Sequence, residues 1–374
     1  MRVKLPEICN IQYGYAFDSA CFSEDESFLP LVRIRDVVRG YSETYYCGDY
    51  SDEYIVREGD LLIGMDGEFN IARWRGGNAL LNQRVCRVTA NAGTDEEYLR
   101  FALMKALKTI EDKTAFVTVK HLSAKELNKL MLDVPPFEDQ RIIANSLSAI
   151  ERIIETRQLE LRKLDDLIKA RFVEMFGDPA DNSRADKVEL SEICEKITDG
   201  EHGSVTRVPS GHPFLNAKHV LKNGRIDWDT ITYVGDEDHQ RIYKRCNPVE
   251  GDILLTTTGT IGNVAIMPNS EEVSMDRGIT LLKIDRQKVT SEFVAELLKQ
   301  PSIQTEMGVN VHASAIGHLF MNKVKKLPAI LPSMARQVEF SDFVRQVDKS
   351  KVVVQKALDE AQLLFDSLMQ KYFG

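Results

Sequence analysis

Basic and amide side chains gather in three short segments of the first half of the chain. We expect the first segment to be a strand that runs into a turn, with Arg33 and Arg35 on one face by side-chain alternation. Arginine and glutamine can each form two hydrogen bonds with a base edge, and basic groups can hold phosphates. The spacing therefore predicts a nucleic-acid-binding surface. Its members in this half are Arg33, Arg35, Arg73, Arg75, Gln83 and Arg84.

A second set of polar side chains follows in the later half of the chain. It includes a threonine-rich glycine turn, in which hydroxyl and backbone N–H groups could bind phosphate oxygens. Any one member is equally well explained as solvated surface charge balanced by nearby carboxylates, so the prediction depends on the whole set. Its members are His202, Lys218, His219, Thr257, Thr258, Thr260, Asn263 and Arg277.

The sequence offers no strong sign of catalysis. It has no GxxxxGK[ST] phosphate loop, no GxGxxG opening a helix after a strand, no HExxH, no GxSxG and no Asn-Pro-Pro-aromatic tetrapeptide. We therefore expect no catalytic residues in this chain, and no ATP-driven work by it.

Acidic and imidazole groups that could hold a metal ion are few and scattered. The segment Asp199–Gly203 could be an acid–base or metal site, but a carboxylate and a histidine in a glycine-rich turn more often form only a loop. His312 and His318 lack a matching cysteine or carboxylate pair, and turn chemistry explains Asp66 and Glu68 as well as cation binding does. We expect no metal site.

The composition is that of a globular protein, since 28% of the 374 residues are charged and 43% are hydrophobic. The length corresponds to two or three domains. A net charge of −9 lowers the expectation of nucleic-acid binding by the chain alone. Six cysteines without a CxxC pair predict reduced, mostly buried thiols. Neither a signal peptide nor a membrane-spanning apolar run is found, so we expect a cytoplasmic protein.

The chain contains an internal repeat. Residues 3–9 return as 188–194, shifted by 185 positions, and Glu58–Leu62 returns as Glu250–Leu254, shifted by 192. Gln140 returns as Gln337 and Phe176–Gly177 as Phe373–Gly374, both shifted by 197. The offset drifts early and is constant late, which indicates variable loops followed by an element of fixed length.

Each copy divides into a mixed segment and a helical tail. The mixed segments, 1–133 and 188–330, contain short strands separated by turn signals, with helices expected over 96–111 and 291–300. The tails cover 134–177 and 331–374, and the polar segment 178–187 is expected to be a linker. The fold class is therefore α+β, with two mixed domains and two long helices.

The tails show apolar side chains at alternating spacings of four and three residues. A seam of this kind, held over more than four heptads, favours a coiled coil. We expect the two helices to pair antiparallel and to hold the mixed domains at opposite ends; the alternative is that each helix packs on its own domain or on another subunit. The seam positions are Ile143, Leu147, Ile150, Ile154, Leu161, Leu164, Ile168, Val344, Val347, Val354, Leu358, Phe365 and Leu368.

Over essentially its full length, the chain resembles the specificity subunits of type I restriction-modification systems. The resemblance rests on the two-copy layout and on a set of short motifs in a fixed order. These are Gly14–Phe17, Asp199–Gly203, the Gly-Asp-(Leu/Ile)-Leu segments, the turn Thr258–Val264, the helix entry Val134–Gln140 and the ending Met175–Pro179.

The resemblance implies two target-recognition domains, each reading one half of a bipartite, asymmetric site in double-stranded DNA. The helices would set the gap between the halves and dock two modification (methyltransferase) subunits, with two ATP-driven restriction subunits in the full complex. S-adenosylmethionine, ATP and Mg would be bound by these partners, and the methylated base would be a flipped adenine.

Two segments depart from the family pattern. Leu62–Asn70 replaces the threonine-rich turn in the first copy, and Leu331–Gln337 retains only the helix entry and Gln337 of its counterpart. Two other hypotheses remain open at this point. The chain could be part of a fused restriction or methyltransferase enzyme, or a coiled-coil assembly protein whose mixed domains bind protein.

Overall fold

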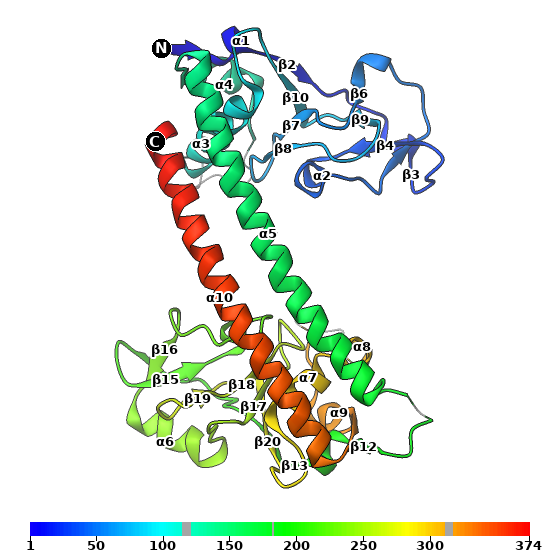
Figure 1. Ribbon diagram of the computed structural model, residues 1–374, viewed down its shortest axis with the longest axis vertical. Coiled ribbons are helices and arrows are strands. Elements are labelled where there is room, and N and C mark those ends of the chain that lie inside the picture. The colour runs from blue at the N-terminus through cyan, green and yellow to red at the C-terminus, as the bar shows by residue number, and fades with distance from the viewer. Residues whose placement is uncertain (114–120, 182, 311–316) are drawn as a thin grey trace. The chain divides into compact units, whose positions relative to one another are not determined.

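The computed structural model describes residues 1–113, 121–181, 183–310 and 317–374, and its chain divides into two compact units (Figure 1). Unit 1 comprises Met1–Gln158 and Lys356–Gly374, and unit 2 comprises Leu159–Gln355. The sequence predicts the long helices as segments separate from the mixed domains. Instead, the boundary between the units falls inside both helices, so each unit contains a part of each.

Unit 1 is built on three small sheets of described strands. Their strands are β1 (Arg2–Lys4), β2 (Cys9–Tyr13), β3 (Phe22–Ser23), β4 (Leu29–Val32), β5 (Tyr45–Tyr46), β6 (Ile55–Val56), β7 (Leu61–Gly64), β8 (Ile71–Arg73), β9 (Ala79–Leu81), β10 (Val85–Ala90) and β11 (Met131–Asp133). The sheet orders are β1-β11, β2-β10-β7-β8 and β3-β5-β4-β9-β6. Pairing is antiparallel except between β4 and β9, which run parallel.

Unit 2 repeats this plan with described strands later in the chain. They are β12 (Lys187–Glu189), β13 (Cys194–Asp199), β14 (Arg207–Val208), β15 (His212–Leu215), β16 (Thr232–Val234), β17 (Ile253–Thr256), β18 (Val264–Ile266), β19 (Ser274–Met275), β20 (Ile279–Ile284) and β21 (Pro328–Ile330). The sheet orders are β12-β21, β13-β20-β17-β18 and β14-β16-β15-β19. The parallel pair β15–β19 is the counterpart of β4–β9.

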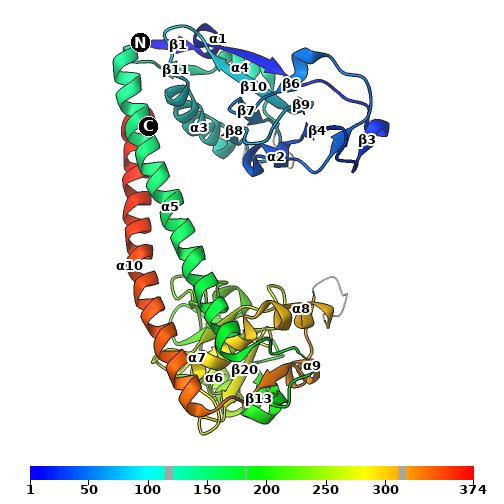
Figure 2. The same ribbon diagram turned by 45° about the vertical axis from the view of Figure 1, so that its right-hand side comes forward.

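Figures 1 and 2 show α3 and α7 beside the central sheet of their units. In unit 1 helices pack on both faces of that sheet, since Leu61 and Ile63 of β7 pack with α3 residues and Leu62 packs with Val37 of α2. The helices of unit 1 are α1 (Leu5–Ile8), α2 (Ile34–Arg39), α3 (Glu96–Lys113) and α4 (Ala124–Lys129). Those of unit 2 are α6 (Asp236–Arg245), α7 (Ser291–Leu298), α8 (Pro301–Val309) and α9 (Met321–Lys325). The mixed content of both units confirms the predicted α+β class. None of the described helices has the length and apolar character needed to cross a membrane.

The long helices α5 (Phe137–Phe176) and α10 (Met334–Phe373) begin at equivalent anchors. Gln140 is buried, accepts a hydrogen bond from Asp95 N (2.9 Å) and donates to Pro135 O (2.9 Å). Gln337 is also buried, accepts from Thr290 N (3.1 Å) and donates to Pro332 O (2.9 Å). In both copies a glutamine therefore satisfies backbone groups at the helix entry, which is why its position in the repeat is fixed.

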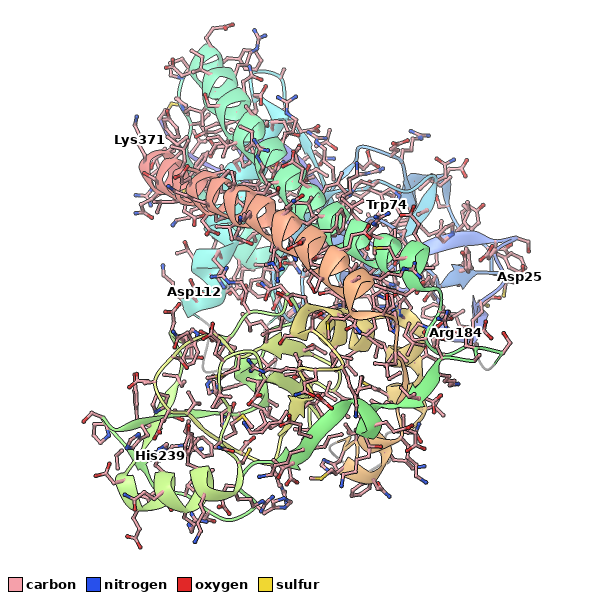
Figure 3. The ribbon with its side chains drawn as sticks, turned by 60° about the horizontal axis from the view of Figure 1, so that its bottom comes forward. Asp25, Trp74, Asp112, Arg184, His239 and Lys371 are labelled. Carbon is pink, nitrogen blue, oxygen red and sulfur yellow. The ribbon has the colours of Figure 1, made fainter. Side chains whose placement is uncertain are left out.

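Within each unit the two long helices run antiparallel. In unit 2, Lys351 Nζ lies 2.8 Å from Asp165 Oδ1, and Arg171 bonds to Glu339 at 3.0 Å, so the residue numbers fall on one helix as they rise on the other. In unit 1, Leu147 packs with Met369 and Phe101. Every predicted seam side chain is buried or half-buried. Figure 3 shows Arg184 just beyond the carboxyl end of α5, where it donates to Phe176 O.

One predicted strand is wrong beyond Val32. Arg33 is the N-cap of α2 and Arg35 lies within that helix, so strand alternation does not place them on one face. The Asp36 carboxylate accepts a hydrogen bond from Arg33 N (3.0 Å), and Gly40 ends the helix in the left-handed conformation, φ 77°. These capping contacts stabilise a helix over the strand expected from the apolar pattern.

The six cysteines are all free. Cys9, Cys86 and Cys246 are buried, and burial raises the pKa of each thiol to about 12, so they remain protonated at neutral pH. Cys47 is exposed, which the prediction of mostly buried thiols did not anticipate.

Candidate nucleic-acid interface

In unit 1 the chain that leaves β2 passes very close to the connection between β9 and β10. A Cβ atom at Gly14 would lie 2.0 Å from Asn82 O, so no other residue fits without a backbone shift. Tyr15 O accepts a hydrogen bond from Gln83 N at 2.7 Å. This crossing fixes the turn Asn82–Arg84 and leaves the side chains of Gln83 and Arg84 exposed.

Unit 2 contains the same crossing with different side chains. A Cβ atom at Gly200 would lie 2.2 Å from Met275 O, and Arg277 N donates to Glu201 O at 3.0 Å. The backbone contacts make Arg277 the counterpart of Gln83 and Gly278 the counterpart of Arg84. We call the segments Asn82–Arg84 and Asp276–Gly278 the crossing turns.

A second turn lies against each crossing turn. In unit 1, Met65 N donates to Arg84 O at 2.8 Å; in unit 2, Thr257 N donates to Gly278 O at 2.8 Å. The turns that follow β7 and β17 therefore occupy equivalent places, and we call Met65–Glu68 and Thr257–Thr260 the flanking turns. Two turns from separate parts of the chain thus form one small polar surface in each unit.

A histidine ties each flanking turn to the helical part of its unit. His121 Nδ1 lies 2.5 Å from Asp66 Oδ1, and the Arg84 guanidinium lies 3.1 Å from the same imidazole. In unit 2, His318 Nδ1 lies 2.7 Å from Thr258 Oγ1. The two histidines are separated by 197 positions, the constant offset of the repeat. This offset is the sequence signal that identifies the pair, whereas residue types alone do not connect the two histidines.

Arg84 has a backbone conformation that side-chain-bearing residues rarely adopt. Its φ is 71°, and among the described residues no other non-glycine has a positive φ. Unit 2 has Gly278 at this place, where the crowding between Cβ and carbonyl oxygen is absent. The arginine is half-exposed and also faces Asp66, whose Oδ2 lies 3.6 Å from Arg84 Nε. Backbone conformations of this kind are found most often at functional sites.

The crossing and flanking turns contain six of the predicted nucleic-acid-binding residues, and five of them, all but the buried Thr257, reach the surface. Gln83 and Arg84 lie on the surface of unit 1, and Thr258, Thr260 and Arg277 on that of unit 2. All five are exposed except Thr258, which is half-buried against His318. Their polar groups can hydrogen-bond to base edges and phosphates.

Other predicted residues are exposed but lie outside these turns. Arg33, Arg35 and Lys218 are exposed on α2 and on the short turn after β15, and Arg75 donates to Val38 O at 3.3 Å. Asn263 is half-buried and donates from its amide to Val220 O at 2.8 Å, which fixes the end of the β17–β18 connection.

Two predicted contacts are contradicted by burial. His219 is fully buried, accepts from Asn216 N at 3.0 Å, and its pKa is lowered mainly by desolvation, so the ring is neutral and enclosed. Thr257 is 1% exposed, with its hydroxyl 3.3 Å from that of Thr280. Both side chains belong to the core. They were predicted to be exposed because they are polar, but the apolar residues of the neighbouring strands enclose them.

Arg73 is held by groups of its own unit. Its guanidinium bonds to Glu96 (2.8 Å), Glu97 (2.5 Å) and the carbonyl of Gly59 (2.8 Å). A nucleic acid would have to displace two carboxylates to reach it, so the contacts assign Arg73 to packing β8 against α3.

The carboxylates of the Asp199–Gly203 turn are paired with basic side chains. The exposed His202 ring lies 2.7 Å from Asp199, and Arg245 and Arg241 bond to Asp199 and Glu201. No cluster of three metal-ligating side chains occurs in the part of the chain that the structure describes. Of the other histidines that the sequence singles out, His312 lies outside the described residues.

Burial affects one acidic group of the crossing turns. Desolvation raises the pKa of Asp276, although its Oδ1 accepts a hydrogen bond from Gly278 N at 2.8 Å. Its counterpart in unit 1 is Asn82, which makes the same kind of contact, Gln83 N to Oδ1 at 2.9 Å, without a charge. The two crossing turns thus have the same backbone hydrogen-bonding pattern but differ in charge.

Comparison with known proteins identifies relatives along the whole chain. The family model described as the type I restriction modification DNA specificity domain matches residues 1–164 and 182–361. The type I restriction enzyme EcoBI specificity subunit of Escherichia coli is 27% identical over 405 aligned positions, which cover 100% of this chain and 85% of that protein. The MjaVIII specificity subunit of Methanocaldococcus jannaschii is 20% identical, with 83% and 77% covered.

The fold is also similar to that of solved structures. The S subunit of a type I restriction-modification system from M. genitalium superposes with a TM-score of 0.57 at 16% identity, covering 100% of this chain and 96% of that one. A chain from a structure of the type I R-M system superposes with a TM-score of 0.51 at 17% identity, covering 100% and 97%.

Proposed function

The chain belongs to the family of type I restriction-modification DNA specificity subunits, and we propose that each of its two units reads one half of a bipartite, asymmetric DNA target. The observation that carries this proposal is the duplicated pair of turns. Each unit presents one crossing turn and one flanking turn on the same backbone frame, but with different side chains. Two similar frames with different polar groups would select two different short sequences.

Unit 1 would read its half-site mainly through Gln83 and Arg84. Both side chains leave a turn whose backbone is fixed by the Gly14 crossing, so their approach to a base edge is pre-organised. Arginine forms paired hydrogen bonds with guanine, and glutamine with adenine. Unit 2 would read through Arg277, with the hydroxyls of Thr258 and Thr260 close by for phosphate or base contacts.

As a specificity subunit, the chain assembles with the other subunits of its system and with DNA. We propose two modification subunits, which would methylate adenine with S-adenosylmethionine, and two restriction subunits, which would bind ATP and Mg. This chain would recognise the target and contribute no catalytic group, and the complex would act in the cytoplasm. Adenine flipping would occur in the modification subunit.

The long helices support a role in docking these subunits. Outside the seam they expose large apolar side chains, among them Val352 (70%), Val353 (69%) and Leu363 (72%). Such side chains next to one another on a helix surface are typical of protein interfaces. The helices would also set the length of the unread spacer between the half-sites.

Mapping the methylated bases tests the proposed function. The chain would be expressed with the modification subunit of its system, in a host that lacks other methyltransferases, and methylated adenines would be located by sequencing. We expect a motif with two specified blocks separated by unspecified base pairs. A single continuous motif would overturn the two-reader proposal, and methylation by this chain without a partner would overturn its non-catalytic role.

A further inference from the structure

A cavity of about 820 Å³ lies within unit 2, between α5 and the connection from β17 to β18. Four of its lining side chains are basic: Arg162 and Lys169 from α5, Lys222 from the turn after β15, and Lys299 from the end of α7. None of the predicted nucleic-acid-binding residues except Asn263 lines it. The cavity therefore adds a feature that the crossing and flanking turns do not explain.

The charges around this cavity do not balance. Its two carboxylates are already paired, since Asp165 contacts Lys351 at 2.8 Å and Glu296 contacts Lys299 at 2.7 Å. Lys169 has only a 3.5 Å contact with Asp166. Arg162 and Lys222 are exposed, and neither lies within ion-pair distance of a carboxylate among the described residues. A surplus of positive charge is left in a chain whose net charge is −9.

The walls of the cavity are held by hydrogen bonds. Gln304 Nε2 donates to Gly262 O (3.0 Å) and to Leu298 O (2.8 Å), which joins the β17–β18 connection to α7 and α8. Gly262 has φ 92°, and a Cβ atom there would lie 2.4 Å from the Gln304 side chain. Asn263 ties the same connection to Val220. The space is therefore part of the folded unit and does not depend on a ligand to form it.

We propose that this cavity binds the sugar–phosphate backbone of DNA beside the half-site read by unit 2, through Arg162 and Lys222. The inference rests on the proposed function. Two unpaired cations that line a cavity are suited to phosphate oxygens, which they would hold without reading sequence. The cavity is lined by Ile261, Gly262, Asn263 and Val264, which continue directly from the flanking turn that carries Thr258 and Thr260.

A double variant, Arg162→Gln with Lys222→Gln, tests the cavity in the complex with modification subunits. Binding would be measured against salt concentration for two probes, a duplex carrying the methylated motif and a random-sequence duplex. We expect both duplexes to bind more weakly by the same factor. The slope of log K against log salt should become shallower by about 1.8, at about 0.9 per phosphate contact. The methylated motif should stay unchanged.

The matched control is Lys325→Gln with Lys326→Gln. It removes the same charge from exposed positions at the end of α9 in unit 2, outside the cavity and away from the long helices. Its salt slope should stay at the wild-type value. Equal thermal unfolding of all proteins would show that the variants are folded. The variant Arg162→Lys with Lys222→Gln keeps one of the two charges, so its slope should change by only about 0.9.

Three results would contradict the proposal in distinguishable ways. An unchanged slope in the cavity variant, with normal wild-type binding, would remove the phosphate site and leave the two-reader function standing. Failure of the cavity variant to co-purify with the modification subunit would assign the cavity to an acidic protein segment instead of DNA. Absence of motif binding by the wild-type complex would contradict the proposed function itself.

Discussion

At the scale of single residues, three of the side chains predicted to bind nucleic acid lie on tight turns between strands. Gln83, Arg84 and Arg277 were predicted from residue type, and the structure puts all three at crossing turns. His219 and Thr257 were predicted on the same grounds but are buried. Residue type says what chemistry a side chain can do; exposure depends on strand pairings distant in sequence, which the sequence does not display.

The variant Arg84→Gly should be more stable than the variant Arg84→Ala. Both substitutions remove the contacts with Asp66 and His121, but only glycine relieves the positive φ of 71°. We expect the free energy of unfolding of Arg84→Gly to exceed that of Arg84→Ala by about 1 kcal/mol. Urea titrations of the purified chain measure this difference. An equal or lower stability for the glycine variant would show that the arginine is not strained.

Asp276 should destabilise unit 2 at neutral pH and cease to do so in acid. Burial raises its pKa, so the folded state prefers the protonated form, and the penalty for the charge is largest above that pKa. We expect Asp276→Asn to be more stable than wild type at pH 7. The gain should shrink as the pH falls through the raised pKa, and vanish below 3.8, the ordinary value.

Asp285→Asn is the control with the opposite sign. Hydrogen bonds led by the one from Lys288 lower the pKa of Asp285, so its carboxylate form stabilises the fold at neutral pH. Urea midpoints of both variants at pH 7 and near pH 3.5 would separate the two effects. If Asp276→Asn lowered the urea midpoint at pH 7, the charged carboxylate would stabilise the folded state, and the argument from burial would be wrong.

At the scale of elements, the long helices were the most predictable part of the fold. Their apolar seam can be recognised from the spacing of residues within each helix alone. Every seam side chain is buried or half-buried. The helix α2 was missed because its apolar residues also fit a strand. Its capping signals, Asp36 and Gly40, were present in the sequence and identify it once they are read. The small sheets could not be predicted, since their registers join residues far apart in the chain.

Phe172 should be the main anchor of α5 in unit 2. Its ring is fully buried and packs on Phe176, Phe293 and Phe340 at centroid distances of 5.1–5.5 Å. We expect Phe172→Ala to lower the free energy of unfolding by about 3–5 kcal/mol through lost burial and a cavity. Val173→Ala, at the neighbouring exposed position, should change it by about 0.5 kcal/mol or less. Denaturant unfolding of both variants checks the contrast.

At the scale of the whole molecule, the repeat predicts that the two halves of the DNA target are recognised independently of each other. Arg84→Ala and Arg277→Ala lie in different units. Each should relax one position in a different half of the methylated motif, at about 1–3 kcal/mol of discrimination. The double variant should relax both by the sum of the two effects. Sequencing of methylated DNA from the three variants measures this, and relaxation of the same half by both would contradict it.

The charge of the chain also acquires a meaning at this scale. A net charge of −9 is unfavourable for a protein that binds DNA alone, but a reader within a complex needs positive charge only at its contacts. The basic cavity and the arginines of the crossing turns are such places. We expect the isolated chain to bind DNA weakly, and the modification subunits to supply much of the affinity.

The division of the chain also bears on the order in which the protein is made. Unit 2 is continuous from Leu159 to Gln355, whereas unit 1 needs Lys356–Gly374 to cover Phe101 and Leu147. On the ribosome, residues 1–158 must therefore keep an uncovered apolar surface until Lys356–Gly374 has emerged. Unit 2 can complete its core earlier, because all of its residues precede Lys356. The unit that is begun first is thus the one whose core is completed later.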